Sequence, residues 1–121
     1  MLFSSSIQDQ LSKVAEIYAS AGFMSKKDME LDGRELSEAV AHGMIEFSRS
    51  IGFPATLKEA GVTENHIDKM VDAAKDPQLK MKLQNMPVPM DSKRGEIENL
   101  MRPTLRAAYS GDLSLIPISK R

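Results

Sequence analysis

Residues 52–74 read GFPATLKEAGVTENHIDKMVDAA, and this stretch contains the signals that divide the chain into helices. Gly52 follows an apolar run, at a point where a helix often ends in a left-handed residue. Pro54 forces the residue before it out of helical geometry. Residues 55–60 predict a short helix closed by a glycine. Thr63 predicts the N-cap of a longer helix, because its hydroxyl can accept a bond from a first-turn N–H group.

Apolar residues recur at spacings of three and four on both sides of this stretch, which predicts amphipathic helices. These helices are expected at about 6–21, 33–51, 78–84 and 92–110. The predicted buried positions are Ile7, Leu11, Val14, Tyr18, Ala21, Leu36, Val40, Met44, Phe47, Ile51, Ile67, Met70, Val71, Ala74, Leu79, Leu83, Ile97, Leu100, Met101, Leu105 and Ala108.

The ends and interruptions of these helices also follow from residue type. Ser5 or Ser6 is the expected cap of the first helix and Ser92 that of the last. Gly43 lies inside the second helix and lowers its stability by about 1 kcal/mol relative to Ala, which close packing against another helix would explain. Pro103 predicts a kink in the last helix, or two helices in series.

The resulting fold class is all-α, a helical bundle of about five to six helices. No alternating strand pattern and no internal repeat is visible in the sequence. We expect one helical domain over residues 1–112 and a tail over residues 113–121. A core of this size leaves a thin stability margin, so association is expected to help.

Composition excludes several classes of function. Acids and bases are interspersed and the net charge is −1, so the chain has no basic field for nucleic acid. It has no Cys for disulfides or thiolate sites and no run near the ~20 apolar residues of a membrane span. The amino terminus lacks the features of a secretory signal, so a cytoplasmic location is expected. Nine Met residues are read as fillers of a helical core, with a partner surface as the alternative.

Residues 57–67 imitate a helix-turn-helix, with a glycine turn and a capped second helix. A recognition helix needs early side chains that attract phosphate and read base edges. Here the early positions include Glu64 and Asp68, whose carboxylates repel the DNA backbone. A DNA-binding function is therefore rejected.

The residues that could bind metal lack the spacing of a metal site. His42 and His66 fall on different predicted helices and are expected to face solvent. Glu64, Asp68 and Asp72 form an acidic row at i, i+4 and i+8 without a matching row elsewhere, so a solvated face is expected. No catalytic residue, cofactor-binding residue or metal ligand is assigned, because the sequence also lacks a nucleophile elbow and a glycine-rich phosphate loop.

The order of these signals resembles the carboxyl-terminal helical part of the iron-containing (group III) alcohol dehydrogenases. In that family a helix ends in a Gly-x-Pro break, a short capped turn opens the next helix, an Asn-Pro loop follows, and a terminal helix ends in Ala-Ala-Tyr. The resemblance spans about Ser6 to Leu115. The matching residues are Lys13 to Ile17, Ile51 to Pro54, Leu57 to Val62, Ile67, Asp72 to Ala74, Asn85 to Pro87, and Ala107 to Tyr109.

This resemblance implies an enzyme that interconverts alcohols and aldehydes with NAD(P) and with iron or zinc. The family's metal ligands and nucleotide loop have no counterpart in this sequence, so the chain alone should not be catalytic. The implied partner is the missing nucleotide-binding half, and the chain would be a split gene product, a truncation or an evolutionary remnant. The alternative is a stand-alone helical interaction or self-association module.

One departure from the family pattern supplies the only candidate site residues. The family's loop carries Pro directly after Asn, whereas this chain reads Asn85-Met86-Pro87, followed by Met90. The resemblance implies that this loop lies toward the cleft between the domains of the complete enzyme. Met86 and Met90 are therefore predicted to tune a cleft wall, with ordinary packing as the alternative. In a complete relative, unchanged substrate preference and KM in a Met86→Ala variant would remove the idea.

Overall fold

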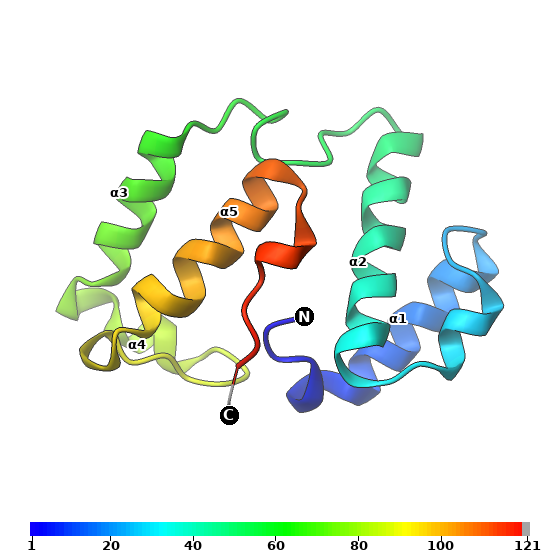
Figure 1. Ribbon diagram of the computed structural model, residues 1–121, viewed down its shortest axis with the longest axis horizontal. Coiled ribbons are helices and arrows are strands. Elements are labelled where there is room, and N and C mark those ends of the chain that lie inside the picture. Colours follow the sequence, from blue (N-terminus) through cyan, green and yellow to red (C-terminus); the bar gives the residue numbers. More distant parts are fainter. Residues whose placement is uncertain (120–121) are drawn as a thin grey trace. The chain divides into compact units, whose positions relative to one another are not determined.

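Every regular element in the computed structural model is helical, as the sequence predicts (Figure 1). The structure describes residues 1–119, apart from the side chain of Lys80. Its α-helices are α1 (Gln8–Ser20), α2 (Gly33–Ser50), α3 (Glu64–Ala74), α4 (Lys80–Gln84) and α5 (Arg102–Ser110). Short 3₁₀ turns are η1 (Ser4–Ile7), η2 (Lys26–Glu30), η3 (Pro77–Leu79), η4 (Ser92–Arg94) and η6 (Leu113–Leu115), and η5 (Ile97–Met101) is a π-helical turn.

The backbone contacts group into two compact units, one of residues 3–55 and one that begins at Thr56. The sequence predicted one helical domain over residues 1–112 and a tail over residues 113–121. Within that tail Leu113–Leu115 form η6, and residues 120–121 lie outside the part of the chain that the structure describes. The two units are described separately below.

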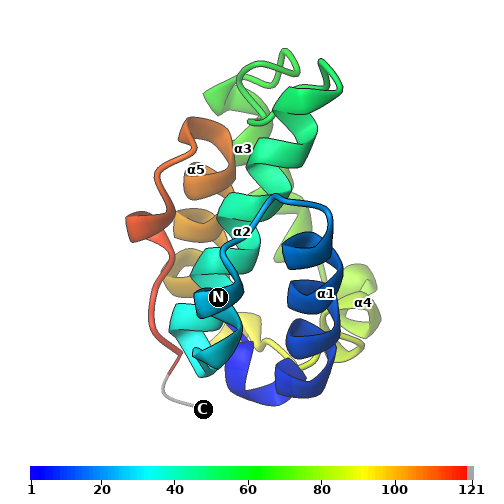
Figure 2. The same cartoon turned by 90° about the vertical axis from the view of Figure 1, so that its right-hand side faces the viewer.

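The first unit is built on the contact between α1 and α2 (Figure 2). The Gly33 N–H donates to Gln8 Oε1 over 2.8 Å, so the two helices start close together. Tyr18 and Phe47 meet edge to face near their other ends, with ring centroids 6.3 Å apart. The two helices therefore run in roughly the same direction. Between these points lies a buried cluster of Leu11, Ala15, Leu36 and Val40.

Gly43 is buried in α2 where the segment after α1 crosses it. A Cβ atom at this position would lie 2.9 Å from Met24 Cγ and 3.3 Å from the Phe23 carbonyl oxygen. The sequence-based expectation of close packing at Gly43 is confirmed, although a loop rather than a helix lies against it.

We expect Gly43→Ala to lower the free energy of unfolding by about 1 kcal/mol. The added methyl group improves helix propensity by about 1 kcal/mol, but forcing apart packed atoms costs typically 1–3 kcal/mol. Urea denaturation of both proteins measures the difference. Combining it with Met24→Ala should recover part of the loss, and a fully additive double mutant would show that the Met24 contact is not its cause.

Ser37 is a buried polar residue of α2 at 2% exposure, and its hydroxyl has no hydrogen-bond partner. A buried unsatisfied group costs about 1–3 kcal/mol. Ser37→Ala is therefore expected to raise the free energy of unfolding by about 1 kcal/mol in urea denaturation. Ser12→Ala is the matched control, because the exposed Ser12 hydroxyl donates to the Gln8 carbonyl and its loss should change stability by less than about 0.5 kcal/mol. A destabilised Ser37→Ala protein would contradict the assignment.

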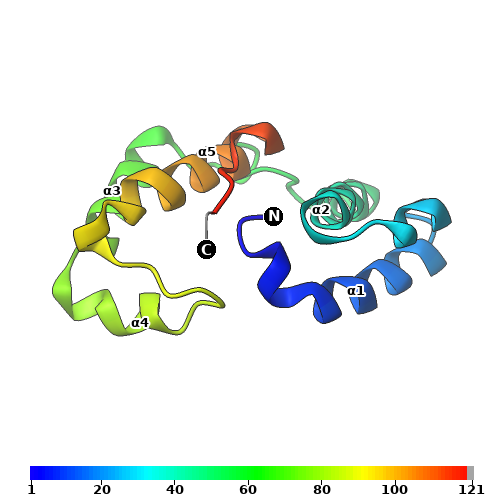
Figure 3. The ribbon, with the colours of Figure 1, turned by 60° about the horizontal axis from the view of Figure 1, so that its bottom comes forward.

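The second unit packs α3 against η5 and α5 (Figure 3). Ile67, Val71 and Ala74 form the buried face of α3, and Ile97 and Ala107 are the most buried residues opposite. The Leu57 N–H donates to the Ala108 carbonyl over 2.9 Å, which ties the segment before α3 to the end of α5. The two helices therefore run in opposite directions.

The π-helical turn η5 explains how the last helix accommodates Pro103. The Arg102 N–H donates to the Ile97 carbonyl, five residues earlier, and α5 begins at Arg102 with Pro103 in its first turn. The π-turn widens the backbone just before Pro103, whose ring and missing N–H do not suit a regular α-helical bond at that position. The interruption predicted at Pro103 is present as a π-helical turn that runs directly into α5.

Several helix ends agree with the local sequence signals. Helix α2 ends at Ser50, next to the expected Ile51, and Gly52 adopts a φ of +70°. Thr63 caps α3 as predicted. Gly61 is left-handed at a φ of +86°, as a closing glycine requires.

Other predicted ends are wrong. No serine side chain caps α1, because Ser4–Ile7 form the 3₁₀ turn η1 and α1 begins only at Gln8. Residues 55–60 form consecutive turns rather than a short helix. Asp91, not Ser92, supplies the cap before the last helix, and it caps the 3₁₀ turn η4.

The predicted buried positions of α3 are confirmed at Ile67, Val71 and Ala74, whereas the predicted stripe of α2 is buried only in its first half. Leu36 and Val40 are buried, whereas the residues that continue the same stripe, Met44, Phe47 and Ile51, are 51%, 40% and 62% exposed. At that end of α2 the Tyr18 and Phe23 rings contact Phe47, yet all three residues of the stripe stay partly exposed. Ala21 and Met70 are also exposed, and Ala107 is buried in place of Ala108. The last difference arises because a π-turn changes the phase of the residues that follow it.

Candidate functional site

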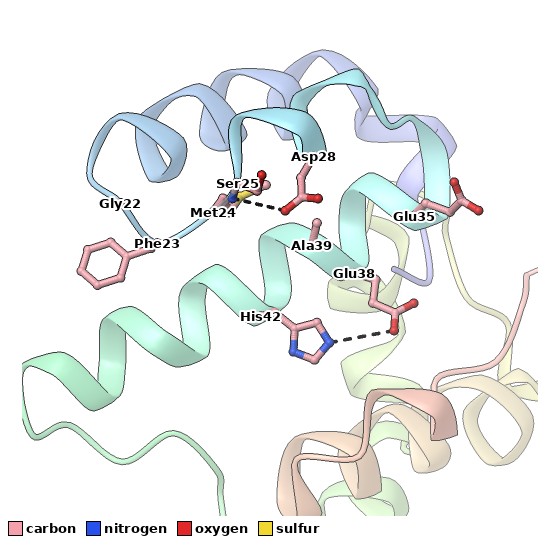
Figure 4. Close-up of a pocket in the computed structure, with 9 residues that line it drawn as sticks. All are labelled: Gly22, Phe23, Met24, Ser25, Asp28, Glu35, Glu38, Ala39 and His42. Carbon is pink, nitrogen blue, oxygen red and sulfur yellow. Dashed lines mark hydrogen bonds and ion pairs between the residues drawn. The ribbon is translucent and has the colours of Figure 1, made fainter.

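A depression in the first unit has a volume of about 600 Å³ and lies between the end of α1, η2 and the middle of α2 (Figure 4). Gly22 ends α1 at a φ of +84°, and the chain then turns so that Phe23 and Met24 form one wall. The opposite wall carries polar side chains of α2 and η2, namely Asp28, Glu35, Glu38 and His42.

These polar groups are mostly engaged with one another or with the backbone. The Asp28 carboxylate accepts from the Ser25 N–H over 3.3 Å, and Ser25 in turn caps η2. His42 Nε2 lies 3.9 Å from Glu38 Oε1 on the next turn of α2. Within the described residues, no group of three or more His, Cys, Asp or Glu side chains is arranged to hold a metal ion. The depression is thus an acidic surface feature without an activated nucleophile.

His42 and His66 are both exposed, as the sequence predicts. His66 nevertheless has a structural role that was not predicted from the sequence, because it helps to cap the start of α3. Its Nδ1 accepts from the Thr63 N–H over 3.1 Å, while Thr63 Oγ1 accepts from the His66 N–H over 3.4 Å. This is a capping box in which His takes the place usually held by Glu or Gln. The sequence signal that could have predicted this capping box is the position of His66 three residues after Thr63.

The predicted cleft-lining loop is only partly accessible. Asn85 and Pro87 are exposed, Met86 is half-buried and Met90 is buried at 3% exposure. The Met90 N–H donates to the Leu83 carbonyl, and the side chain lines a recess of about 310 Å³ near the end of α3. The structure therefore brings Met90, but not the other three residues, into a recess. The role of the loop in a cleft remains a prediction.

The acidic row of α3 takes part in a cluster of ion pairs on the second unit. Arg102 donates to Asp68 of α3 and to Glu98 of η5, each over 2.5 Å. Lys75 Nζ lies 2.5 Å from Glu98 Oε1 and 3.6 Å from Asp72 Oδ1. The cluster therefore connects the middle and the carboxyl-terminal end of α3 to η5 and to the start of α5. We call this set of ion pairs between helices the clamp. Its members are Asp68, Asp72, Lys75, Glu98 and Arg102.

These contacts shift the pKa values of the groups in the clamp. Hydrogen bonds from Arg102 and Lys75 lower the pKa of Glu98 to about 2. The bond to Glu98 raises the pKa of Lys75, and bonds to Glu98 and Asp68 raise that of Arg102. Both bases therefore keep their charge at neutral pH and well above it.

The clamp predicts an acid-dependent loss of stability. Because the pKa of Glu98 is lower in the folded state than its ordinary value of 4.5, its contribution is complete above that value. It is lost progressively as the pH falls from about 4.5 towards 2. Thermal unfolding across this range should show a shallower pH dependence in Glu98→Gln than in the parent. Identical pH profiles would exclude Glu98 as a source of the dependence.

None of the helices in the described residues is both long enough and apolar enough to cross a lipid bilayer. A comparison of the chain with protein-family models, with curated proteins and with solved structures gave no match.

Proposed function

We propose that this chain is the carboxyl-terminal helical segment of a cytoplasmic, metal-dependent and NAD(P)-linked alcohol dehydrogenase, and that it is inactive by itself. The observation that carries the proposal is the order of the chain breaks. A helix followed by Gly52-Phe53-Pro54, a turn before a Thr-capped helix, the loop around Asn85 and a final helix through Tyr109 occur in the order of the iron-containing family.

The residues of this chain do not fit the metal or the dinucleotide that such an enzyme requires. His66 closes the capping box of α3 and His42 stands beside Glu38 on the surface of α2. No metal-binding group occurs in the described residues, and the sequence has no glycine-rich phosphate loop. Iron or zinc and NAD(P) would therefore be held by a separate nucleotide-binding half. The role of this chain would be to cover one side of that half.

A second candidate is a stand-alone helical module for self-association or for binding another protein. The observation that favours it is the large exposed apolar side chains found on both units. Monomeric proteins expose single apolar residues freely, but contiguous ones mark contact surfaces. The residues with more than half of their surface exposed are Ile17, Met44, Ile51, Phe53, Met81 and Ile118.

Complementation separates the two candidates. The full chain is mixed with the separately expressed nucleotide-binding half of an iron-containing alcohol dehydrogenase, loaded with iron or zinc. Alcohol-dependent reduction of NAD(P), absent with either polypeptide alone, is the expected result. A folded chain that neither binds the half nor restores turnover would remove the enzyme proposal and leave the self-association module.

A further inference from the structure

We propose that the uncovered end of α2 binds the same surface of a second copy of this chain. The inference rests on the second candidate function, self-association, and assigns it a surface. This surface, called here the α2 stripe, consists of Met44, Phe47 and Ile51.

The α2 stripe continues the core-facing row of its helix. Leu36 and Val40 occupy the first turns of that row and are buried against the first unit. The stripe residues follow at helical spacing, yet 40–62% of each side chain is exposed. Phe47 is held in place by rings on two sides, with Phe23 at 5.5 Å and Tyr18 at 6.3 Å between centroids. A fixed aromatic side chain in a contact surface loses little conformational entropy on binding.

The charges of α2 lie away from the stripe. Successive helical residues are rotated by about 100°, which places His42, Glu46 and Arg49 roughly 130–190° from the centre of the stripe. Glu46 and Arg49 moreover pair with each other over 2.9 Å. A partner of opposite charge is therefore not required, and two copies of the stripe can meet without bringing like charges together. This favours an isologous contact, in which the same patch is used on both copies.

The available area indicates how strong the contact is. The exposed parts of the three stripe side chains leave roughly 300 Å² of apolar surface per copy. A standard stable interface needs about 800 Å² per partner. The expected species is therefore a weak dimer that forms as protein concentration rises, rather than an obligate dimer.

Sedimentation velocity of the full chain, from micromolar to millimolar concentration, tests the proposal. We expect a monomer–dimer equilibrium whose dissociation constant rises at least about tenfold in Met44→Lys and in Ile51→Lys, because each places a charge in the apolar contact. Ile17→Lys is the matched control, since Ile17 is 68% exposed on the side of α1 that faces away from its buried residues. It should change the constant less than about twofold.

Circular dichroism confirms that each variant is folded before its dissociation constant is interpreted. A folded parent chain that remains monomeric over the whole range would overturn the proposal. A dimer that is equally stable in all three variants would also overturn it, while leaving self-association through another surface intact. Success or failure of complementation with a nucleotide-binding half does not affect either result, so the two proposals fail separately.

Discussion

Leu36→Ala is expected to lower the free energy of unfolding of the first unit by about 2–5 kcal/mol. Leu36 is 1% exposed and lies in the same cluster as Leu11, Ala15 and Val40, so truncation removes contacts on every side. The larger neighbours, Leu11 and Val40, belong to α1 and α2 respectively. Because each is fixed on a helical backbone, neither can move far enough to fill the cavity that the truncation leaves. Urea denaturation followed by circular dichroism measures the change.

Met29→Ala is the control for this substitution. Met29 belongs to the same unit and is also a large apolar residue, but it is 42% exposed in η2. Its truncation should cost less than that of Leu36, because a large part of the Met29 side chain already contacts water. Equal losses in the two variants would show that Leu36 is not at the centre of the unit's core.

The elements that the sequence predicted well are those fixed by local backbone chemistry. Gly52 and Pro54 stop α2, and Thr63 starts α3, because left-handed geometry, a missing N–H and a capping hydroxyl act within a few residues. The close packing at Gly43 was also predictable, because a glycine inside a helix lowers its stability and is therefore expected where a larger side chain would not fit. In each case the signal and its effect lie close together in the chain.

The predictions that failed required knowledge of distant parts of the chain. The apolar period of α2 continues unchanged through Met44, Phe47 and Ile51, and nothing in that period says where the covering elements end. Which half of a stripe is buried depends on the length and direction of α1. Pro103 predicted an interruption in the last helix, but not that it takes the form of a π-turn over Ile97–Met101.

The clamp on the second unit shows the same limit for polar residues. Glu98 and Arg102 are four residues apart, so their pairing on a helix could be expected from the sequence. Asp68 lies 34 residues from Arg102, and only the antiparallel packing of α3 and α5 brings them together. The residues of the acidic row are exposed, as the sequence predicts, but the pairing of Asp68 and Asp72 in an ion-pair clamp could be seen only in the fold.

Ile97→Ala is expected to lower the free energy of unfolding of the second unit by about 2–5 kcal/mol. The Ile97 side chain is 1% exposed where η5 packs against α3, so its loss leaves a cavity between these two elements. The Ile97 carbonyl also accepts the five-residue bond of the π-turn from Arg102. A loosened first turn would therefore weaken the position of Arg102 in the clamp.

This coupling makes the test sharper than a measurement of stability alone. In Ile97→Ala the acid-dependent loss of stability attributed to Glu98 should become shallower, because Glu98 directly follows the altered residue and the Arg102 N–H donates to its carbonyl. Met81→Ala, on a residue of the same unit that is 78% exposed, should change neither stability nor the pH profile. An Ile97→Ala protein that is destabilised but keeps the parent's full acid dependence would show that core packing and the ion-pair clamp stabilise α3 against α5 independently.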